Sequence, residues 1–183
     1  MSRQIERTRA AIIGAFSELV FTNNYENIKM SDIARDANVG RSTLYQHYRD
    51  KDAILLESMD WILVGLAACI KAQGPADETR QLLEHIWAHR DKARRILFGT
   101  TGDKLQRVLS AKLEQKLTEN FLGNEDVAGD IWRVSPVFIA NQIAACQLST
   151  LRSWVGGEAP ASAPALSLHL HETTRALADA ALA

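Results

Sequence analysis

The sequence predicts an all-α protein, and three observations carry that prediction. Apolar residues recur three or four positions apart over most of the chain, which is the period of one face of a helix. Glycine, proline, serine and asparagine stand between these stretches, where they end one helix and begin the next. No stretch alternates apolar and polar residues as a half-buried strand does. We therefore expect helices throughout, in one or two domains for 183 residues.

The first expected helix covers residues 3–22. Its apolar residues have helical spacing and form one stripe, which consists of Ile5, Ile12, Phe16, Leu19 and Val20. A polar loop over residues 22–29 follows, and we expect Tyr25 and Ile28 within it to pack onto the core of the first three helices.

Residues 30–51 have the pattern of two short helices joined by a tight turn. Ser31 can cap the first helix through its hydroxyl, and Asn38 tolerates the left-handed conformation that ends a helix. Gly40 suits the start of a second helix, which we expect to run from Arg41 to Tyr48. Such a pair is a helix-turn-helix, whose second helix enters the major groove of DNA.

The stretch VGRSTLYQHYRDKDAIL resembles the signature of the TetR family of transcriptional repressors. The matching residues are Thr43, Leu44, Tyr45, His47, Tyr48 and Lys51, with Ile33, Ala34 and Val39 upstream. Gly40 and Ser42 depart from the family pattern, which often has Ser and Gly at these positions. The resemblance covers about the first third of the chain. It implies a three-helix DNA-binding head over residues 1–50 and a helical ligand-binding and dimerisation body over residues 51–183.

The expected DNA contacts divide by role. The resemblance implies that Thr43, Tyr45, His47 and Lys51 touch the sugar-phosphate backbone or thymine methyl groups. Base edges can be read from the exposed side of the second helix, because Arg pairs with guanine and Gln with adenine. The side chains expected there are Arg41, Ser42 and Gln46. A further expected phosphate contact is Ser31, at the start of the first short helix.

The body also reads as helices, which end at glycine or proline residues. The expected ranges are 51–73, 77–89, 91–98, 103–122, a long helix that Ser135 and Pro136 begin and Gly156-Gly157 ends, and 165–182. Gly99 and Gly102 are expected to separate the third helix of this series from the fourth, and residues 124–130 form a polar loop.

The resemblance implies a small-molecule pocket in the body, for an effector that is partly apolar or aromatic. The side chains that can line it are Met59, Trp61, Trp87, Phe98, Phe138 and Trp154, with Gln142 or Asn141 to orient the ligand. These large side chains also suit an ordinary core, and that alternative stays open.

The last two helices resemble the dimer interface of the family, where two copies form a four-helix bundle. Small residues would let the helices approach closely, namely Ala144, Ala145, Ala176, Ala178, Ala180 and Ala181. Leu177 is expected on the interface face of the last helix. The sequence thus predicts a homodimer that binds an inverted-repeat operator in double-stranded DNA.

Composition and charge give further information about the class of protein and its location. The net charge is −1, but residues 1–51 carry eight Lys or Arg against six Asp or Glu, which suits DNA binding by the N-terminal third. We expect neither a signal peptide nor a membrane span, and a cytoplasmic location. Cys69 and Cys146 are expected to be reduced core residues.

No catalytic motif is present, so we expect neither an enzyme nor a cofactor. His85 and His89 have a spacing that can chelate zinc, but no Glu follows His85 as a zinc-protease motif requires, and we expect no metal site. The favoured function is a ligand-responsive repressor that releases its operator when a small molecule binds the body. The alternative is a helical protein-interaction adaptor that keeps the helix-turn-helix without specific DNA binding.

Overall fold

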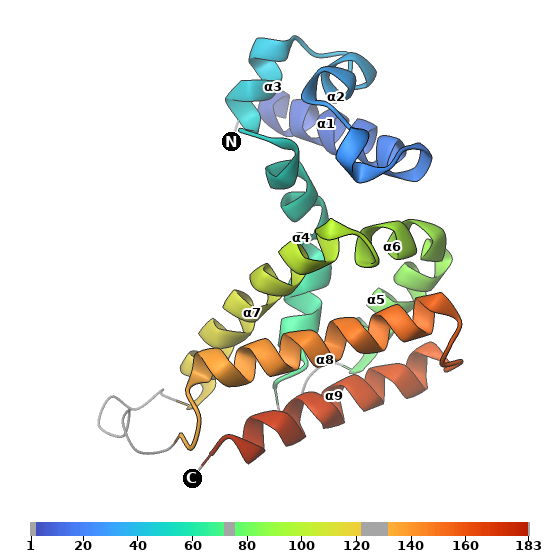
Figure 1. Cartoon of the computed structure of the whole chain (residues 1–183). Coiled ribbons are helices and arrows are strands. Elements are labelled where there is room, and N and C mark those ends of the chain that lie inside the picture. The colour runs from blue at the N-terminus through green and yellow to red at the C-terminus, as the bar shows by residue number, and fades with distance from the viewer. Residues whose placement is uncertain (1–2, 72–75, 122–131, 183) are drawn as a thin grey trace. The chain divides into compact units, whose positions relative to one another are not determined.

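The all-α prediction is confirmed by the computed structural model, which describes residues 3–71, 76–121 and 132–182 (Figure 1). Within these ranges the chain forms nine α-helices and one short 3₁₀ helix, and no β-strand. None of the helices in the described part of the chain has the length and apolar character that crossing a bilayer requires. The chain divides into two compact units, residues 1–60 and 61–183.

The first unit, called the head below, contains the helix-turn-helix. Its elements are α1 (Arg3–Thr22), η1 (Tyr25–Asn27), α2 (Met30–Asp36), α3 (Arg41–His47) and the start of α4 (Lys51–Ala68). Its core side chains come from all five, and they are Ile12, Phe16, Leu19, Val20, Tyr25, Ile28, Ile33, Ala34, Leu44, Tyr48, Ile54 and Leu55. The expected packing of the loop between the first two helices is confirmed. Ile5, at the start of the predicted stripe, is 40% exposed and lies outside this core.

The second unit, called the body below, is built around α8. Its elements after the end of α4 are α5 (Ala76–Ala88), α6 (Arg90–Leu97), α7 (Thr100–Phe121), α8 (Pro136–Gly156) and α9 (Ala163–Ala180). Helix α8 packs against α6, α7 and α9, and α9 also packs against α5. In Figure 1, α8 and α9 lie side by side.

The ends of α8 follow the sequence rules that predict them. The Ser135 hydroxyl accepts a hydrogen bond from the Phe138 N–H at 3.3 Å, and Pro136 occupies the first turn. Gly157 closes the helix with φ 85°, a conformation that glycine adopts without strain. These two signals explain why this long helix has the predicted bounds.

Two predicted helix boundaries are wrong. Helix α4 ends at Ala68, about a turn before the expected end near residue 73. Gly102 does not end a helix, because it lies in the first turn of α7 against the end of α6. The Arg152 guanidinium donates to the Leu97 carbonyl at 2.9 Å beside it, so a side chain at position 102 would collide with this cap. The predicted loop 124–130 lies outside the described residues.

The compact head extends ten residues beyond the expected limit at residue 50, because the first half of α4 packs with it. Buried Ile54 and Leu55 come from this half of α4. Helix α4 therefore contributes residues to both units, and the division falls between Asp60 and Trp61 inside a continuous helix.

The two cysteines differ in environment. Both thiols are free, and Cys69 is fully buried whereas Cys146 is partly exposed. Burial raises the pKa of the Cys69 thiol to about 11, so this residue stays protonated and unreactive near neutral pH. The core prediction is confirmed for Cys69 and is wrong for Cys146.

Candidate nucleic-acid interface

The turn between α2 and α3 is closed by the backbone. The Val39 N–H donates to the Ala34 carbonyl at 3.0 Å, and the Leu44 N–H donates to the Gly40 carbonyl at 2.9 Å. Asn38 stands between them with φ 53°, in the left-handed region that Asn tolerates. The predicted end of the first short helix at Asn38 is confirmed. This geometry fixes where α3 begins relative to α2.

Helix α3 has a buried side and an exposed polar side. Leu44 is fully buried, and Tyr48, which follows the helix, is 4% exposed. The exposed side chains are Arg41, Ser42, Tyr45 and Gln46, and the partly exposed ones are Thr43 and His47. Six of the predicted DNA-contact residues are therefore brought together on one seven-residue helix. Their donors and acceptors suit phosphate oxygens and base edges.

Ser31 lies in the first turn of α2, but it is not the cap. The helix begins at Met30, and Lys29 occupies the capping position. The Asp32 carboxylate accepts from the Lys29 N–H at 3.3 Å, so Asp32 supplies the polar contact that the sequence assigns to Ser31. Ser31 is partly exposed, and its predicted phosphate contact stays a prediction.

The exposed arginines near the turn differ in their partners. Arg35 forms ion pairs with Asp32 and Asp36, at 3.4 and 2.9 Å. Arg41 forms no ion pair with any residue in the described ranges, and its guanidinium is exposed. Ser31, Arg35 and Arg41 border one shallow depression of about 490 Å³. Arg41 is thus a free cation at the junction of the two short helices, available to an anionic partner.

Lys51 has partners that its sequence position does not reveal. Its ammonium donates to the carbonyl oxygens of Tyr25, Glu26 and Ile28, at 2.8, 3.1 and 3.1 Å. It also lies 4.5 Å from the centre of the Tyr25 ring. The predicted phosphate contact would therefore require breaking bonds that the ammonium already makes.

A second polar contact in the head joins residues far apart in the sequence. Arg9 of α1 pairs with Glu57 of α4, and its guanidinium lies 5.7 Å from the centre of the Tyr48 ring. Burial, and then the nearby Glu57 charge, raise the pKa of Tyr48 to about 12. The sequence carries no signal for this pair, because 48 residues separate its members.

The predicted ligand-binding residues have different neighbours. Met59 belongs to the head, and the other predicted residues belong to the body. Trp61 packs edge-on against His85 at 4.9 Å between ring centres, and Trp87 packs against Trp154 at 4.9 Å. Phe98 is 56% exposed. These side chains therefore have separate surroundings, and a shared ligand pocket stays a prediction.

Two predicted ligand-binding residues share an exposed side of α8. Phe138 is 52% exposed, and Gln142 follows it one turn later. Asn141 is exposed as well, and its amide donates to the Val137 carbonyl at 2.9 Å. These side chains face outward, so they suit a surface contact better than an enclosed ligand site.

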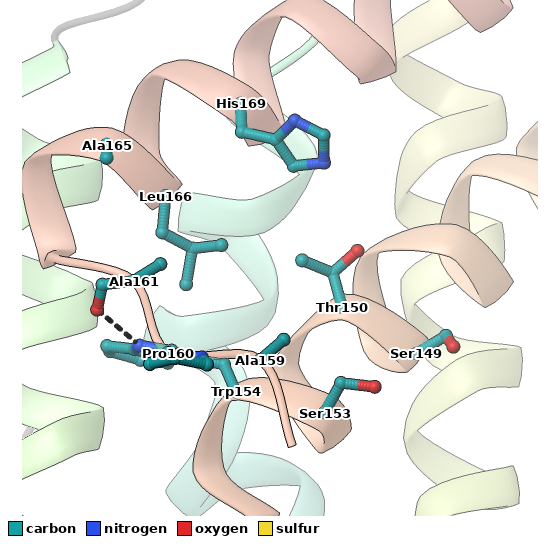
Figure 2. A pocket seen from close by; sticks show the side chains of 10 residues that line it. All are labelled: Ser149, Thr150, Ser153, Trp154, Ala159, Pro160, Ala161, Ala165, Leu166 and His169. Carbon is teal, nitrogen blue, oxygen red and sulfur yellow. Dashed lines mark hydrogen bonds between the residues drawn. The ribbon is translucent and has the colours of Figure 1, made fainter. Parts of the chain in front are cut away.

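A groove of about 490 Å³ lies between the second half of α8 and the start of α9 (Figure 2). The side chains that line it are Ser149, Thr150, Ser153, Trp154, Ala159, Pro160, Ala161, Ala165, Leu166 and His169. The Trp154 indole donates to the Ala161 carbonyl at 2.9 Å, and this bond holds the connection between the two helices (Figure 2). Trp154 is the one lining residue that the sequence already marked as a pocket candidate, and the others carry no sequence signal.

His85 of α5 and His89, which precedes α6, are exposed neighbours with ring centres 4.6 Å apart. Burial and the nearby positive charges of His89 and Lys92 lower the pKa of His85. Within the described ranges, no group of three or more His, Cys, Asp or Glu residues could hold a metal ion.

Comparison with known proteins adds a family assignment to this geometry. Residues 12–58 match the family described as bacterial regulatory proteins, tetR family. A curated relative, an uncharacterised HTH-type transcriptional regulator of Haemophilus influenzae, is 33% identical over 58 residues, which are 31% of this chain and 28% of the relative. The chain spans between 15% and 56% of the length of the first three curated relatives that it matches.

Solved structures match over nearly the whole chain. A TetR transcriptional regulator from Streptococcus agalactiae has a TM-score of 0.59 at 23% identity, over 94% of this chain and 96% of that one. FadR of Thermus thermophilus, a TetR-family repressor in complex with lauroyl-CoA, has a TM-score of 0.52 at 18% identity, over 91% and 94%. At these identities the likeness establishes the fold. It extends the resemblance from the head to the helical body.

Proposed function

Because the chain belongs to the tetR family of bacterial regulatory proteins, we propose that it is a dimeric repressor of an inverted-repeat operator, which it releases when a small molecule binds its body. The observation that carries this proposal is the polar outer side of α3, held in place by the buried Leu44. Such a regulator acts where the DNA is, in the cytoplasm, and without catalysis.

The proposed DNA contacts follow from exposure and chemistry. Arg41, Ser42 and Gln46 read base edges, because guanidinium and carboxamide groups can each form paired hydrogen bonds with purines. Thr43, Tyr45 and His47 contact the sugar-phosphate backbone or thymine methyl groups, and Ser31 contacts a phosphate near the start of α2. Arg41, the free cation at the junction, supplies part of the salt-dependent affinity.

The proposed effector is partly apolar or aromatic. FadR of Thermus thermophilus, whose fold this chain shares, was crystallised with lauroyl-CoA. Large apolar side chains of this chain are also accessible in the body, among them Trp61, Trp87, Phe98 and Phe138, at 41–56% exposure. These two observations therefore support the chemical class of the effector, which is partly apolar or aromatic.

The proposed dimer forms through the outer sides of α8 and α9. One short α3 helix reaches only a few base pairs, so selective binding needs two heads. Ala145, Ala176 and Ala180 are accessible and allow close approach, whereas Ala144, Ala178 and Ala181 are buried inside the monomer. Leu177 is partly exposed on α9, and its expected place on the interface side of this helix stays part of the proposal.

Selection from a pool of random double-stranded DNA tests the proposal. We expect an enriched inverted repeat whose half-sites are about one helical turn apart. Arg41→Ala should weaken binding strongly, and Arg35→Ala should do so much less, because Asp32 and Asp36 already neutralise Arg35. Retention of DNA without an enriched sequence, equal for both variants, would favour the protein-interaction adaptor instead.

A further inference from the structure

The ammonium of Lys51 has no hydrogen-bond donor left for DNA. A lysine ammonium carries three N–H donors and no acceptor. All three can be assigned to backbone carbonyls, those of Tyr25, Glu26 and Ile28. The first two belong to η1 and the third to the residue that ends it. Lys51 therefore holds the C-terminal end of η1, where the Tyr25 carbonyl also accepts from the Ile28 N–H at 3.1 Å.

Tyr25 and Asp52 complete the same attachment. The Tyr25 hydroxyl donates to the carboxylate of Asp52, the residue after Lys51. Burial and the Asp52 contact raise the pKa of Tyr25, so the hydroxyl keeps its proton for this bond. The ring of Tyr25 is 8% exposed and packs edge-on against Phe16, with 6.3 Å between ring centres. The first turn of α4 thus holds η1 through two adjacent side chains.

The attachment lies next to the start of α2. Lys29 directly follows the last carbonyl that Lys51 binds, and the Lys29 carbonyl accepts from Asp32 N–H at 3.0 Å and Ile33 N–H at 3.3 Å. The buried side chain of Ile33 then fixes α2 on the core that also carries α3. A shift of η1 would therefore move the start of α2.

We propose that Lys51 is a positioning residue for DNA binding, which acts by fixing η1 and the start of α2 rather than by contacting a phosphate. The inference rests on the proposed DNA-binding function. It differs from the contact that the family resemblance implies for this residue. A direct DNA contact and a positioning role predict different salt dependence, because a cation that neutralises DNA charge releases counterions, whereas a cation that stays on protein carbonyls does not.

The deciding measurement is the affinity of Lys51→Met for the selected operator at several salt concentrations. Methionine keeps much of the aliphatic chain and removes the charge and the donors. We expect weaker binding by about tenfold or more at every salt concentration, with the slope of log affinity against log salt unchanged. Arg41→Met is the control, because it removes a cation from the exposed side and should reduce the slope by about one.

Each contrary result is informative. A slope reduced by about one in Lys51→Met would overturn the proposal in favour of a phosphate contact. Operator affinity is measured at a temperature where circular dichroism shows the variant to be fully folded. If Lys51 contributed only to stability, the affinity would then be unchanged. Unchanged affinity would also overturn the proposal.

Tyr25→Phe provides a second variant that removes no cation. It loses the hydroxyl bond to Asp52, and we expect weaker operator binding with an unchanged salt slope. Hydrogen exchange at the Asn27 and Ile28 amides, which donate within η1 at 3.0 and 3.1 Å, should quicken in both variants. If these amides exchange as slowly in the variants as in the unaltered chain, Lys51 and Tyr25 do not hold η1. This measurement needs no operator, so it tests the inference even if the proposed DNA-binding function is wrong.

Discussion

The head and the body place their polar side chains in opposite ways. On α3 of the head, polar residues are exposed around a buried Leu44. In the body, the 1% exposed Gln147 donates to the Leu66 carbonyl at 3.1 Å and to the Thr174 hydroxyl at 2.8 Å. Large apolar side chains of the body are instead exposed, such as Leu168 at 58%.

This difference shows that the two units keep their polar groups for different purposes. The head exposes hydrogen-bonding groups from one short segment, which suits the proposed contact with DNA. The body uses buried hydrogen bonds to join α4, α8 and α9, where an unpaired donor would be costly. Its exposed apolar surface suits contact with a partner that is itself apolar.

The largest expected effect concerns that apolar surface. Ser149→Glu places a charge in the groove between α8 and α9, where the proposed dimer would bury it. We expect a folded monomer and at least a hundredfold loss of operator affinity, measured by analytical ultracentrifugation and gel shift. Gln81→Glu, on the exposed side of α5, is the matched control and should remain dimeric. A dimeric Ser149→Glu protein with normal binding would place the interface elsewhere.

One glycine in each unit allows the tightness of backbone packing in the head and the body to be compared. A Cβ at Gly102 of the body would lie 2.5 Å from the Leu97 carbonyl oxygen, whereas a Cβ at Gly14 of the head would have no neighbour within 4 Å. Gly102→Ala should therefore lower the free energy of unfolding by about 1–3 kcal/mol. Gly14→Ala should raise it by about 0.5–1 kcal/mol, because alanine favours the helix. Urea denaturation measures both, and equal effects would refute the difference in packing.

Loss of a base contact by α3 is expected to change the free energy of DNA binding by a similar amount, and to leave the free energy of unfolding unchanged. Gln46→Ala should cost about 1–3 kcal/mol at one or two operator positions, because a paired contact to adenine is lost. Its exposed position on α3 means that stability should hardly change. A repeated DNA selection with the variant shows which positions lose their preference. The same consensus as before would mean that Gln46 reads no base.

The smallest expected effect is a pH dependence of the stability, which arises from histidines of the body. The pKa of His85 is lowered from its ordinary value of 6.5, first by burial, and the pKa of His171 is lowered for the same main reason. The folded chain thus binds these protons less tightly than the unfolded chain. Stability should therefore decline as the pH falls below about 6.5, until the folded-state histidines are protonated too.

The edge-on contact of Trp61 with His85 provides the readout for this dependence. Denaturation monitored by tryptophan fluorescence between pH 5 and 8 should show the decline, and His85→Asn should make it smaller. If the variant and the unaltered chain have the same pH profile, His85 does not contribute.

The sequence by itself determined the helices of the head and the exposed polar side of α3. Hydrophobic spacing and the capping residues Ser135 and Gly157 are local signals, so the bounds of a helix such as α8 can be read from neighbouring residues. The residues of α3 are contiguous, and the helical period alone separates the buried Leu44 from the exposed Gln46. The match to the tetR family covers residues 12–58, which contain this helix.

Only the tertiary structure decided the partners of Lys51, the neighbours of the aromatic residues in the body, and the groove beside α8. Lys51 meets carbonyls 23 to 26 residues away, and Gln147 meets a carbonyl 81 residues away. Helical periodicity states which side of a helix is apolar, but not which other helix or loop will lie against it. Contacts between distant segments depend on how the helices pack, and this packing is a property of the whole fold.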